Sequence, residues 1–412
     1  MLLLLIWKAV MVMSRIEELI KQKCPNGVEY FPLLTVANVL YGYPCDASLF
    51  NTKSDGKPLA RIRDVLSGVS DTYTTENVPE RYELAKGDLL VGMDGKFHVA
   101  NWKTDGGILC QRVCKVYSVD VENTVTNGYL SHILGPIIKK IEEGKPSGTV
   151  KHLLDKDIKA IEIPVPPMEV QQEIVYILDS FVELELELQA ELKARKKQYE
   201  YYREKLLNFG NDVEYRSLGD SCYIKARIGW QKLNKSEYLS EGDYYLVTGV
   251  NITKANRVDF GSCYFVSKER YDMDVNIQLQ NGDIIITKDG TIGKVALIEE
   301  MDKPAVLNSH LFVIRDITGK LNHKFLLYIF LSNYFARFVE GNKTSGTIAG
   351  LNQATMVKFS IPFPSLDEQE HIVGILDKFV QLIESMTKEI EARHKQYEYY
   401  RDKLLTFERK VV

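Results

Sequence analysis

A glycine-rich turn, KDGTIGK, carries lysine, aspartate and threonine side chains at residues 288–294. The turn follows a predicted strand, and its glycines let the backbone approach another molecule closely. A second turn, MDGKFH at residues 93–98, follows a similar strand in the first half of the chain. Amine, hydroxyl and imidazole groups on such turns can contact phosphate oxygens and base edges. The candidate DNA-binding side chains on these turns are Lys96, His98, Lys288, Asp289, Thr291 and Lys294.

A further pair of loops repeats a pattern of lysine, serine, glycine and threonine. GKPSGT occupies residues 144–149 and NKTSGT occupies residues 342–347, each in the last loop before a strand and a long helix. Taken singly, each loop is explained as well by an ordinary turn. Their recurrence at matching places favours a shared binding role. The candidate DNA-binding side chains here are Lys145, Ser147, Lys343, Thr344 and Ser345.

Arg61 and Arg63 alternate along a stretch that is predicted to be a β-strand. Side chains two residues apart on a strand point to the same face, so both guanidinium groups would project together toward DNA. A solvated strand edge explains the same pattern equally well.

The chain lacks the sequence patterns of common catalytic sites. Residues 290–294 have the wrong spacing for a phosphate-binding loop, and no G-x-G-x-x-G or G-x-S-x-G pattern occurs. The seven histidines show no metal-ligand spacing, and the six cysteines form no CxxC pair. We therefore expect no catalytic residue, no metal site, and free thiols in a reducing compartment.

The composition is that of an ordinary globular protein. The 412 residues are 45% hydrophobic and 26% charged, which suits two or three domains. The formal net charge of −4 does not by itself indicate a nucleic-acid-binding protein. Any DNA binding must therefore depend on local groups.

The first 13 residues, MLLLLIWKAVMVM, are apolar apart from Lys8. This stretch is shorter than the roughly 20 residues that span a bilayer, and it lacks the basic start and the cleavage site of a secretory signal. We expect an upstream extension, with Met13 as the natural initiator; a short membrane or partner contact is the alternative. No other segment resembles a transmembrane helix, so we expect a cytoplasmic protein.

The chain contains an internal repeat. Residues 148–209 and 346–407 align without a gap at an offset of 198, and 29 of 62 positions are identical. The densest match is KQYEYYREKLL at 197–207 against KQYEYYRDKLL at 395–405. Each copy follows a longer and more divergent segment, so the repeat predicts internal two-fold symmetry.

Each repeat contains a helix with an apolar heptad seam, which is typical of a coiled coil. Each helix would run for about 40 residues, or about 60 Å. Glu185 interrupts the first seam, and Arg195 and Arg393 interrupt both seams at the same register. These arginines either have a carboxylate or carbonyl partner or extend into solvent. The seam residues are Ile174, Leu178, Phe181, Leu188, Leu192, Tyr199, Tyr202, Leu206, Ile372, Leu376, Phe379, Ile383, Met386, Ile390, Tyr397, Tyr400 and Leu404.

The segments before the two repeats are predicted to be mostly β-strand with some helix. Short β-branched and aromatic runs alternate with Gly, Asp and Asn, as in residues 244–253. GDLLVGMDG at 87–95 parallels GDIIITKDG at 282–290, which indicates a common fold in both segments. Residues 14–23 can supply a short helix near the end of the C-terminal helix, which would make the arrangement circular. An ordinary leading helix is the alternative.

Two junction sequences carry a family resemblance. They are IPVPPMEVQQEIVYILDSF and IPFPSLDEQEHIVGILDKF, each placed between a β-rich segment and a long helix. This alternation, together with the start IEELIKQKCPNGVEYFPL, resembles the specificity (S) subunits of type I restriction–modification enzymes. The resemblance covers nearly the whole chain from about residue 14.

The resemblance implies an α+β fold. Two mixed α/β target recognition domains in a pseudo-two-fold arrangement would be separated by two long antiparallel coiled-coil helices. The expected divisions are an N-terminal extension with a short helix (1–26), recognition domain 1 (27–165), spacer helix 1 (166–210), recognition domain 2 (211–363) and spacer helix 2 (364–412).

The resemblance also implies a function. Each recognition domain would bind one half of a bipartite site in double-stranded DNA, and the helices would set the spacing and dock two methyltransferase (M) subunits. Nuclease/translocase (R) subunits would join through the complex. S-adenosylmethionine, ATP and Mg are expected on the partner subunits and no cofactor on this chain. The alternative is a structural coiled-coil scaffold without DNA readout.

Overall fold

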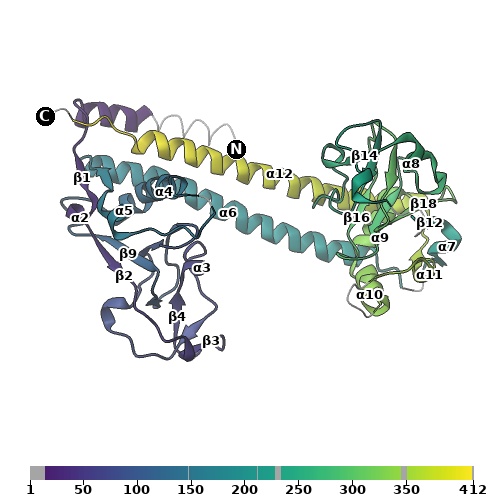
Figure 1. Cartoon of the computed structure of the whole chain (residues 1–412), viewed down its shortest axis with the longest axis horizontal. Coiled ribbons are helices and arrows are strands. Elements are labelled where there is room, and N and C mark those ends of the chain that lie inside the picture. Colours follow the sequence, from purple (N-terminus) through teal and green to yellow (C-terminus); the bar gives the residue numbers. More distant parts are fainter. Residues whose placement is uncertain (1–13, 147, 211, 228–232, 345–349, 411–412) are drawn as a thin grey trace. The chain divides into compact units, whose positions relative to one another are not determined.

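The computed structural model describes residues 14–146, 148–210, 212–227, 233–344 and 350–410 (Figure 1). The chain divides into two compact units. Unit 1 contains residues up to 189 together with those from 388 onward, and unit 2 contains residues 190–387. Ser147 and Ser345 lie outside the described residues, as do residues 1–13.

Unit 1 is built on two small sheets. The first has the strand order β2-β9-β6-β7 and is antiparallel throughout. The second has the order β3-β5-β4-β8, with β4 and β8 parallel. The strands of these sheets are β2 (Ala37–Tyr41), β3 (Phe50–Asn51), β4 (Lys57–Ala60), β5 (Tyr73–Thr74), β6 (Leu89–Gly92), β7 (Val99–Asn101), β8 (Ile108–Leu109) and β9 (Val113–Ser118).

Helices and a short strand pair complete unit 1. Strands β1 (Tyr30–Pro32) and β10 (Glu162–Pro164) pair antiparallel just before the first long helix. Thr126 caps α4 (Asn127–Glu143) by accepting a hydrogen bond of 3.0 Å from the N–H of Tyr129, as expected of an N-cap threonine. The short helices are α2 (Leu33–Val36), α3 (Ile62–Val65) and α5 (Asp155–Lys159).

Unit 2 repeats this framework. Its sheet order β12-β18-β15-β16 matches β2-β9-β6-β7, and its second sheet, β14-β13-β17, again contains one parallel pair. The strands are β11 (Tyr215–Ser217), β12 (Cys222–Ala226), β13 (Tyr244–Val247), β14 (Tyr264–Val266), β15 (Ile284–Thr287), β16 (Val295–Leu297), β17 (Ala305–Leu307), β18 (Leu311–Asp316) and β19 (Ser360–Pro362). The helices are α7 (Leu218–Ser221), α8 (Lys268–Asp272), α9 (His323–Leu331), α10 (Asn333–Asn342) and α11 (Gln353–Met356).

The apolar run of β15 is explained by burial of both faces of the sheet β12-β18-β15-β16. In β15, Ile284 and Ile286 belong to the core beneath the helices, whereas Ile285 belongs to the core shared with the second sheet. Successive side chains of a strand point to opposite faces. A strand covered on both sides therefore reads as a continuous apolar run.

The two long helices are α6 (Met168–Leu206) and α12 (Leu366–Leu405), and each contributes one part to each unit. In unit 1, the Phe181 and Tyr400 rings stack with centroids 5.4 Å apart. In unit 2, Phe379 and Tyr202 stack at the same distance. In unit 1 a second contact joins Glu185, four residues after Phe181, to His394, six residues before Tyr400, so the two helix parts run antiparallel there. The seam side chains are buried or half-buried except Tyr202, which is 39% exposed.

The seam arginines have partners on their own helices. Arg195 Nε donates to Glu191 Oε1 at 2.8 Å, and Arg393 Nε donates to Glu389 Oε1 at 2.8 Å. In both cases the carboxylate lies one turn earlier, where i and i+4 side chains meet. The guanidinium groups are therefore satisfied by a carboxylate.

The chain's described ends pack together in unit 1. Residues 14–23 are helical, and Ile16 is buried with Leu404 in one core. The N–H of Val28 donates to the carbonyl of Glu408 at 2.9 Å, and the N–H of Lys410 donates back to Val28 at 2.9 Å. The circular arrangement is therefore present within this unit.

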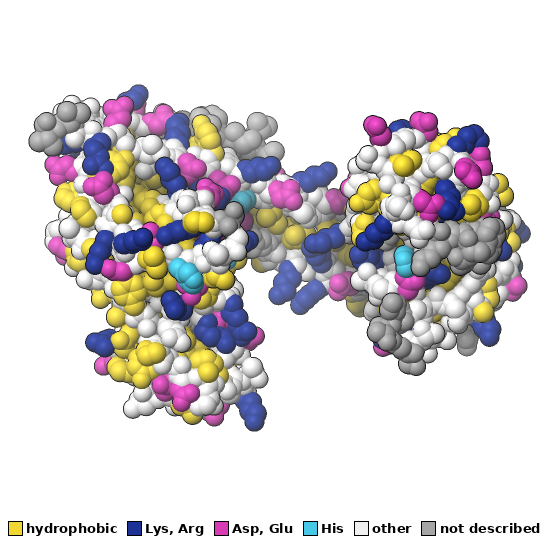
Figure 2. All heavy atoms as spheres, viewed as in Figure 1, with side chains coloured by type: hydrophobic (Ala, Val, Ile, Leu, Met, Phe, Trp, Pro, Cys, Tyr) yellow, Lys and Arg dark blue, Asp and Glu magenta, His cyan; other side chains and the backbone are white. Residues whose placement is uncertain are grey.

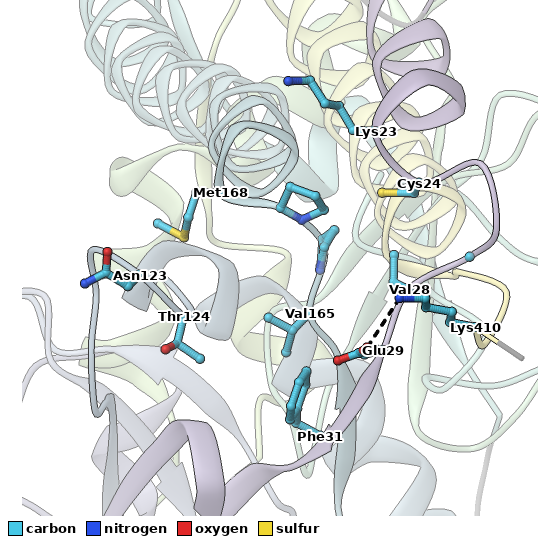
Figure 3. Close-up of a pocket in the computed structure, with 13 residues that line it drawn as sticks. Lys23, Cys24, Val28, Glu29, Phe31, Asn123, Thr124, Val165, Met168 and Lys410 are labelled. Atoms are coloured by element: carbon cyan, nitrogen blue, oxygen red, sulfur yellow. Dashed lines mark hydrogen bonds and ion pairs between the residues drawn. The ribbon is translucent and has the colours of Figure 1, made fainter. Parts of the chain in front are cut away.

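A cavity of about 380 Å³ lies beside this junction (Figure 3). Phe31, Val165 and Met168 give it apolar walls, and Lys410 Nζ lies 3.5 Å from Glu29 Oε1 at its rim. In the close-up, the β1 segment and the start of α6 border it.

The six cysteines are free thiols, all of them buried except the half-buried Cys24. Within the described parts of the chain, no cluster of three or more His, Cys, Asp or Glu side chains has metal-binding geometry. No helix among the described residues is both long enough and apolar enough to cross a membrane.

Candidate nucleic-acid interface

Main-chain hydrogen bonds bring the predicted binding loops together in each unit. They lie at one end of the strands of the sheet β2-β9-β6-β7 in unit 1 and of the sheet β12-β18-β15-β16 in unit 2. In unit 1, the N–H of Leu153 donates to the carbonyl of Met93 at 2.7 Å. In unit 2, the N–H of Leu351 donates to the carbonyl of Lys288 at 2.7 Å. The turn that follows β6 in unit 1 and β15 in unit 2 therefore lies against the last loop before the long helix. The same pair of backbone positions is hydrogen-bonded in both units.

Asp94 is the centre of the unit 1 loop cluster. Its Oδ1 lies 2.7 Å from His152 Nδ1, and its Oδ2 lies 3.5 Å from Arg112 Nε. Lys96 is exposed beside it, and His98 is half-buried. The cluster therefore holds cationic and polar donors on a framework that the strands fix.

Asp289 has the same position in unit 2. Its Oδ1 lies 2.6 Å from His310 Nδ1. Lys288 Nζ lies 5.9 Å from the centroid of the Phe312 ring, which is within reach of a cation–π interaction. Thr291 and Lys294 are exposed on the turn.

The lysines of the last loops have carboxylate partners. Lys145 Nζ lies 2.5 Å from Asp157 Oδ2 in a half-buried pair, and Lys343 Nζ lies 2.6 Å from Glu340 Oε1. The N–H of Thr344 donates to the carbonyl of Gly350 at 2.9 Å, and its hydroxyl accepts from the N–H of Gly350 at 3.0 Å. Lys145 is therefore less available to DNA than Lys343, which is 42% exposed.

Unit 2 has a cavity of about 360 Å³ at this edge, lined by residues that include Ala226, Lys288 and Gln353. In unit 1, Tyr41 stands at the strand position of Ala226, since Tyr41 pairs with Cys114 as Ala226 pairs with Phe312. The Tyr41 hydroxyl donates to Asp155 Oδ1 at 2.8 Å. The equivalent strand ends of the two units therefore have the same backbone pairing but different side chains at the surface.

The prediction that Arg61 and Arg63 alternate on a strand is wrong. Strand β4 ends at Ala60, Arg61 is the N-cap of α3, and Arg63 lies within that helix. Both guanidinium groups instead converge on the Thr72 hydroxyl, at 2.6 and 2.9 Å. A hydrogen bond from Thr72 and the neighbouring Arg63 lower the pKa of Asp71. The two arginines thus stabilise the fold around Thr72.

Three side chains of the clusters were missed by the sequence analysis, namely Arg112, His152 and His310. Each is a lone basic residue without a surrounding motif. A signal was available, because Arg112 and His310 are separated by the repeat offset of 198 and each immediately precedes an equivalent strand, β9 or β18.

The charge on the described surface is mixed. Figure 2 shows lysine and arginine side chains interspersed with acidic ones, without a continuous basic surface on the visible face of either unit. The loop clusters are accordingly small groups of hydrogen-bond donors and are not part of a broad basic patch.

Comparisons with known proteins give the chain a family. The sequence model of the type I restriction modification DNA specificity domain matches residues 25–195 and 210–392. The specificity subunit of the type I restriction enzymes EcoR124I and EcoR124II of Escherichia coli is 33% identical over 60% of this chain, and the match spans 63% of that relative's own length. The EcoBI specificity subunit of Escherichia coli is 24% identical over 86% of this chain and 80% of its own.

A solved structure supports the fold. The crystal structure of a type I restriction-modification system S subunit from M. genitalium matches with a TM-score of 0.53 and 15% identity, over 92% of this chain and 96% of that one. At this identity the likeness concerns the fold alone. The two matched segments cover most of the sequence and confirm the resemblance, and the chain belongs to the type I restriction modification DNA specificity domain family.

Proposed function

We propose that this chain is the DNA specificity subunit of a type I restriction–modification complex, in which each unit reads one half of a bipartite site. The observation that carries the proposal is the pair of equivalent loop clusters around Asp94 and Asp289. Their backbones share one register, whereas the side chains around them differ. A common framework with different donors suits two half-sites of different sequence.

The spacing between half-sites is assigned to α6 and α12. Both helices are unbroken over 39 and 40 residues. Stacking of Phe181 on Tyr400 in unit 1 and of Phe379 on Tyr202 in unit 2 supports a rigid pair of helices in each unit. A rigid helix pair holds a distance better than a flexible linker does.

Docking of two M subunits is assigned to exposed residues that both repeats share. Tyr201 is 61% exposed and its equivalent Tyr399 is 62% exposed. Lys197 and Lys395 are also identical and exposed. Tyr201 and Tyr399 make edge contacts with the neighbouring Tyr202 and Tyr400, but most of each residue stays exposed, as binding two copies of one partner requires. R subunits would join through that complex.

Chemistry is assigned to the partner subunits. S-adenosylmethionine, ATP and Mg would bind there, and this chain would contribute no catalytic residue. The net charge of −4 leaves little general attraction to the phosphate backbone. We therefore expect weak DNA binding by the chain alone and tight binding once M subunits are present.

The test is enrichment of a random duplex pool by this chain together with its M subunit. A split motif, with two defined parts separated by a fixed number of unspecified base pairs, is the expected result. If the complex forms and enriches no sequence, the chain is a structural scaffold and the proposal is wrong.

A further inference from the structure

Arg112 and His310 occupy the same place in the two units. The carbonyl of Arg112 accepts from the N–H of Met93 at 2.9 Å, and the carbonyl of His310 accepts from the N–H of Lys288 at 3.0 Å. The strand that follows each of them is paired in equivalent fashion, Val113 with Gly92 and Leu311 with Thr287. Both side chains are 64% exposed.

An aspartate carboxylate lies beside each of these side chains. Asp94 Oδ2 lies 3.5 Å from Arg112 Nε, and the Asp94 side chain is only 19% exposed. Asp289 Oδ1 lies 2.6 Å from His310 Nδ1, and the Asp289 side chain is 28% exposed. Each carboxylate is itself placed by the β-bridge of its residue, to His152 in unit 1 and to Gly350 in unit 2.

The contact with aspartate uses one nitrogen of each side chain and leaves the other nitrogens available to a base. Arg112 is engaged through Nε, and its terminal nitrogens have no hydrogen-bond partner among the residues that the structure describes. A guanidinium group presented in this way matches the O6 and N7 acceptors of guanine in the major groove. His310 contacts the carboxylate through Nδ1; because an ionised carboxylate can only accept, Nδ1 carries the hydrogen, and Nε2 takes no part in this bond.

We infer that Arg112 and His310 are equivalent base-reading residues, that Asp94 and Asp289 position them, and that Arg112 selects guanine. The inference rests on the proposed function and adds its specificity-determining side chains. The change from arginine to histidine at one structural position gives the two units different base preferences. This is the simplest way for a repeated framework to read two different half-sites.

The backbone of Arg112 has an unusual conformation. Its φ of 70° lies in the left-handed region that non-glycine residues seldom adopt. The carbonyl of the same residue is fixed by Met93. The Arg112 backbone is thus fixed, and the ion pair at 3.5 Å keeps Nε beside Asp94 Oδ2.

The experiment uses the complex of this chain with its M subunit and sequences the DNA that it selects from a random duplex pool. Arg112→Ala should reduce discrimination at one guanine of one half-site by about tenfold or more, without changing the other half-site. His310→Ala should reduce discrimination at one position of the opposite half-site. Asp94→Asn should give a smaller loss at the same position as Arg112→Ala.

Controls separate base reading from general affinity and from folding. Lys21→Ala removes one exposed charge from unit 1 outside the loop cluster and should leave every position of the motif unchanged. Arg112→Asn serves if Arg112→Ala is unstable, because asparagine tolerates left-handed backbone. A uniform loss of affinity for all sequences in Arg112→Ala would make Arg112 a phosphate contact and overturn the inference. Failure of the unaltered complex to select any motif would instead refute the proposed function.

Discussion

Gln171 Oε1 accepts a hydrogen bond of 3.0 Å from the backbone N–H of Thr126, the residue that caps α4. Its Nε2 donates to the carbonyls of Thr124 and Pro166, both at 2.9 Å. Gln369 makes the same three kinds of bond to Asn322, Lys320 and Pro364. One buried glutamine at the start of each long helix therefore joins that helix to the recognition framework of its unit.

Gln171→Ala should lower the free energy of unfolding by about 1–3 kcal/mol, because one buried and two half-buried backbone groups lose their partner. The measurement is urea unfolding of the full chain, with hydrogen exchange to locate the effect in unit 1. Gln172→Ala, at the exposed neighbouring position, is the matched control. Equal stability of the two variants would contradict the proposed role of Gln171.

Double-mutant cycles should detect the aromatic contacts of the helices. We expect a coupling energy of about 0.5–1.5 kcal/mol between Phe181 and Tyr400, and a similar value between Phe379 and Tyr202. The pairs have the same geometry, with interplanar angles of 23° and 25°. Tyr176, which is 65% exposed, provides a control substitution without coupling. A cycle that closes to zero for either pair would mean that its stacking does not stabilise the protein.

Removal of one heptad from each long helix should shorten the unspecified gap between half-sites. Deleting residues 188–194 and 386–392, which are equivalent by the repeat offset of 198, removes about 10 Å of each helix at 1.5 Å per residue and keeps the seam in register. At about 3.4 Å per base pair the gap should lose about three base pairs. Motif selection measures it, and an unchanged gap would show that the helices do not set the spacing.

Lys288→Ala with Lys294→Ala should weaken binding through the half-site read by unit 2 alone. Both lysines lie on the turn beside Asp289, and Lys294 is exposed. Affinity of the complex for DNA altered in one half-site or the other measures the effect. Lys254→Ala removes an exposed charge elsewhere in unit 2 and is the control. An equal effect on both half-sites would argue against this turn as a local contact.

The buried thiols should make stability fall at alkaline pH. Burial raises the pKa of Cys114, Cys222 and Cys263 to about 12 each. Because the folded pKa exceeds the unfolded pKa of about 8.5, the stabilisation is complete below that pH and is lost as the pH rises toward 12. Between these values each thiol should contribute a loss of about 1.4 kcal/mol per pH unit.

Unfolding measured from pH 8 to pH 11 checks this expectation. A variant with all three cysteines replaced by alanine should show a smaller decline, after correction for its lower starting stability. Parallel declines in the two proteins would show that other groups dominate the pH dependence.

Much of the fold could be predicted because it depends on periodicity and on the repeat. The seam from Ile174 onward follows a heptad pattern, and residues such as Ile284 to Ile286 form an apolar run with turns on both sides. Both signals are local. Arg61 was misplaced because Asp64 Oδ2 accepts from the N–H of Arg61 at 3.2 Å and starts a helix turn where alternation predicted a strand. That side-chain bond outweighs the weak strand pattern.

The loop clusters were only partly predictable. Glycine-rich turns marked Asp289 and Lys288, but the approach of His310 depends on strand pairing that brings residues 21 positions apart together. The contact between Asp94 and His152 spans 58 positions. Neither distance along the chain leaves a recognisable motif, so these partners become visible only in the folded protein.

The pairing of Val28 with the segment around Arg409 has a consequence for synthesis. Unit 2 is a continuous stretch, residues 190–387, and can fold as soon as it leaves the ribosome. Unit 1 is made first, yet it needs residues from 388 onward, which are made last. Its smaller cores contain only residues between 40 and 113, but the core that holds Ile16 and the start of α6 lacks Leu404 and Leu405 until the rest of the chain has been translated. The half of the protein that is synthesised first is the half that is completed last.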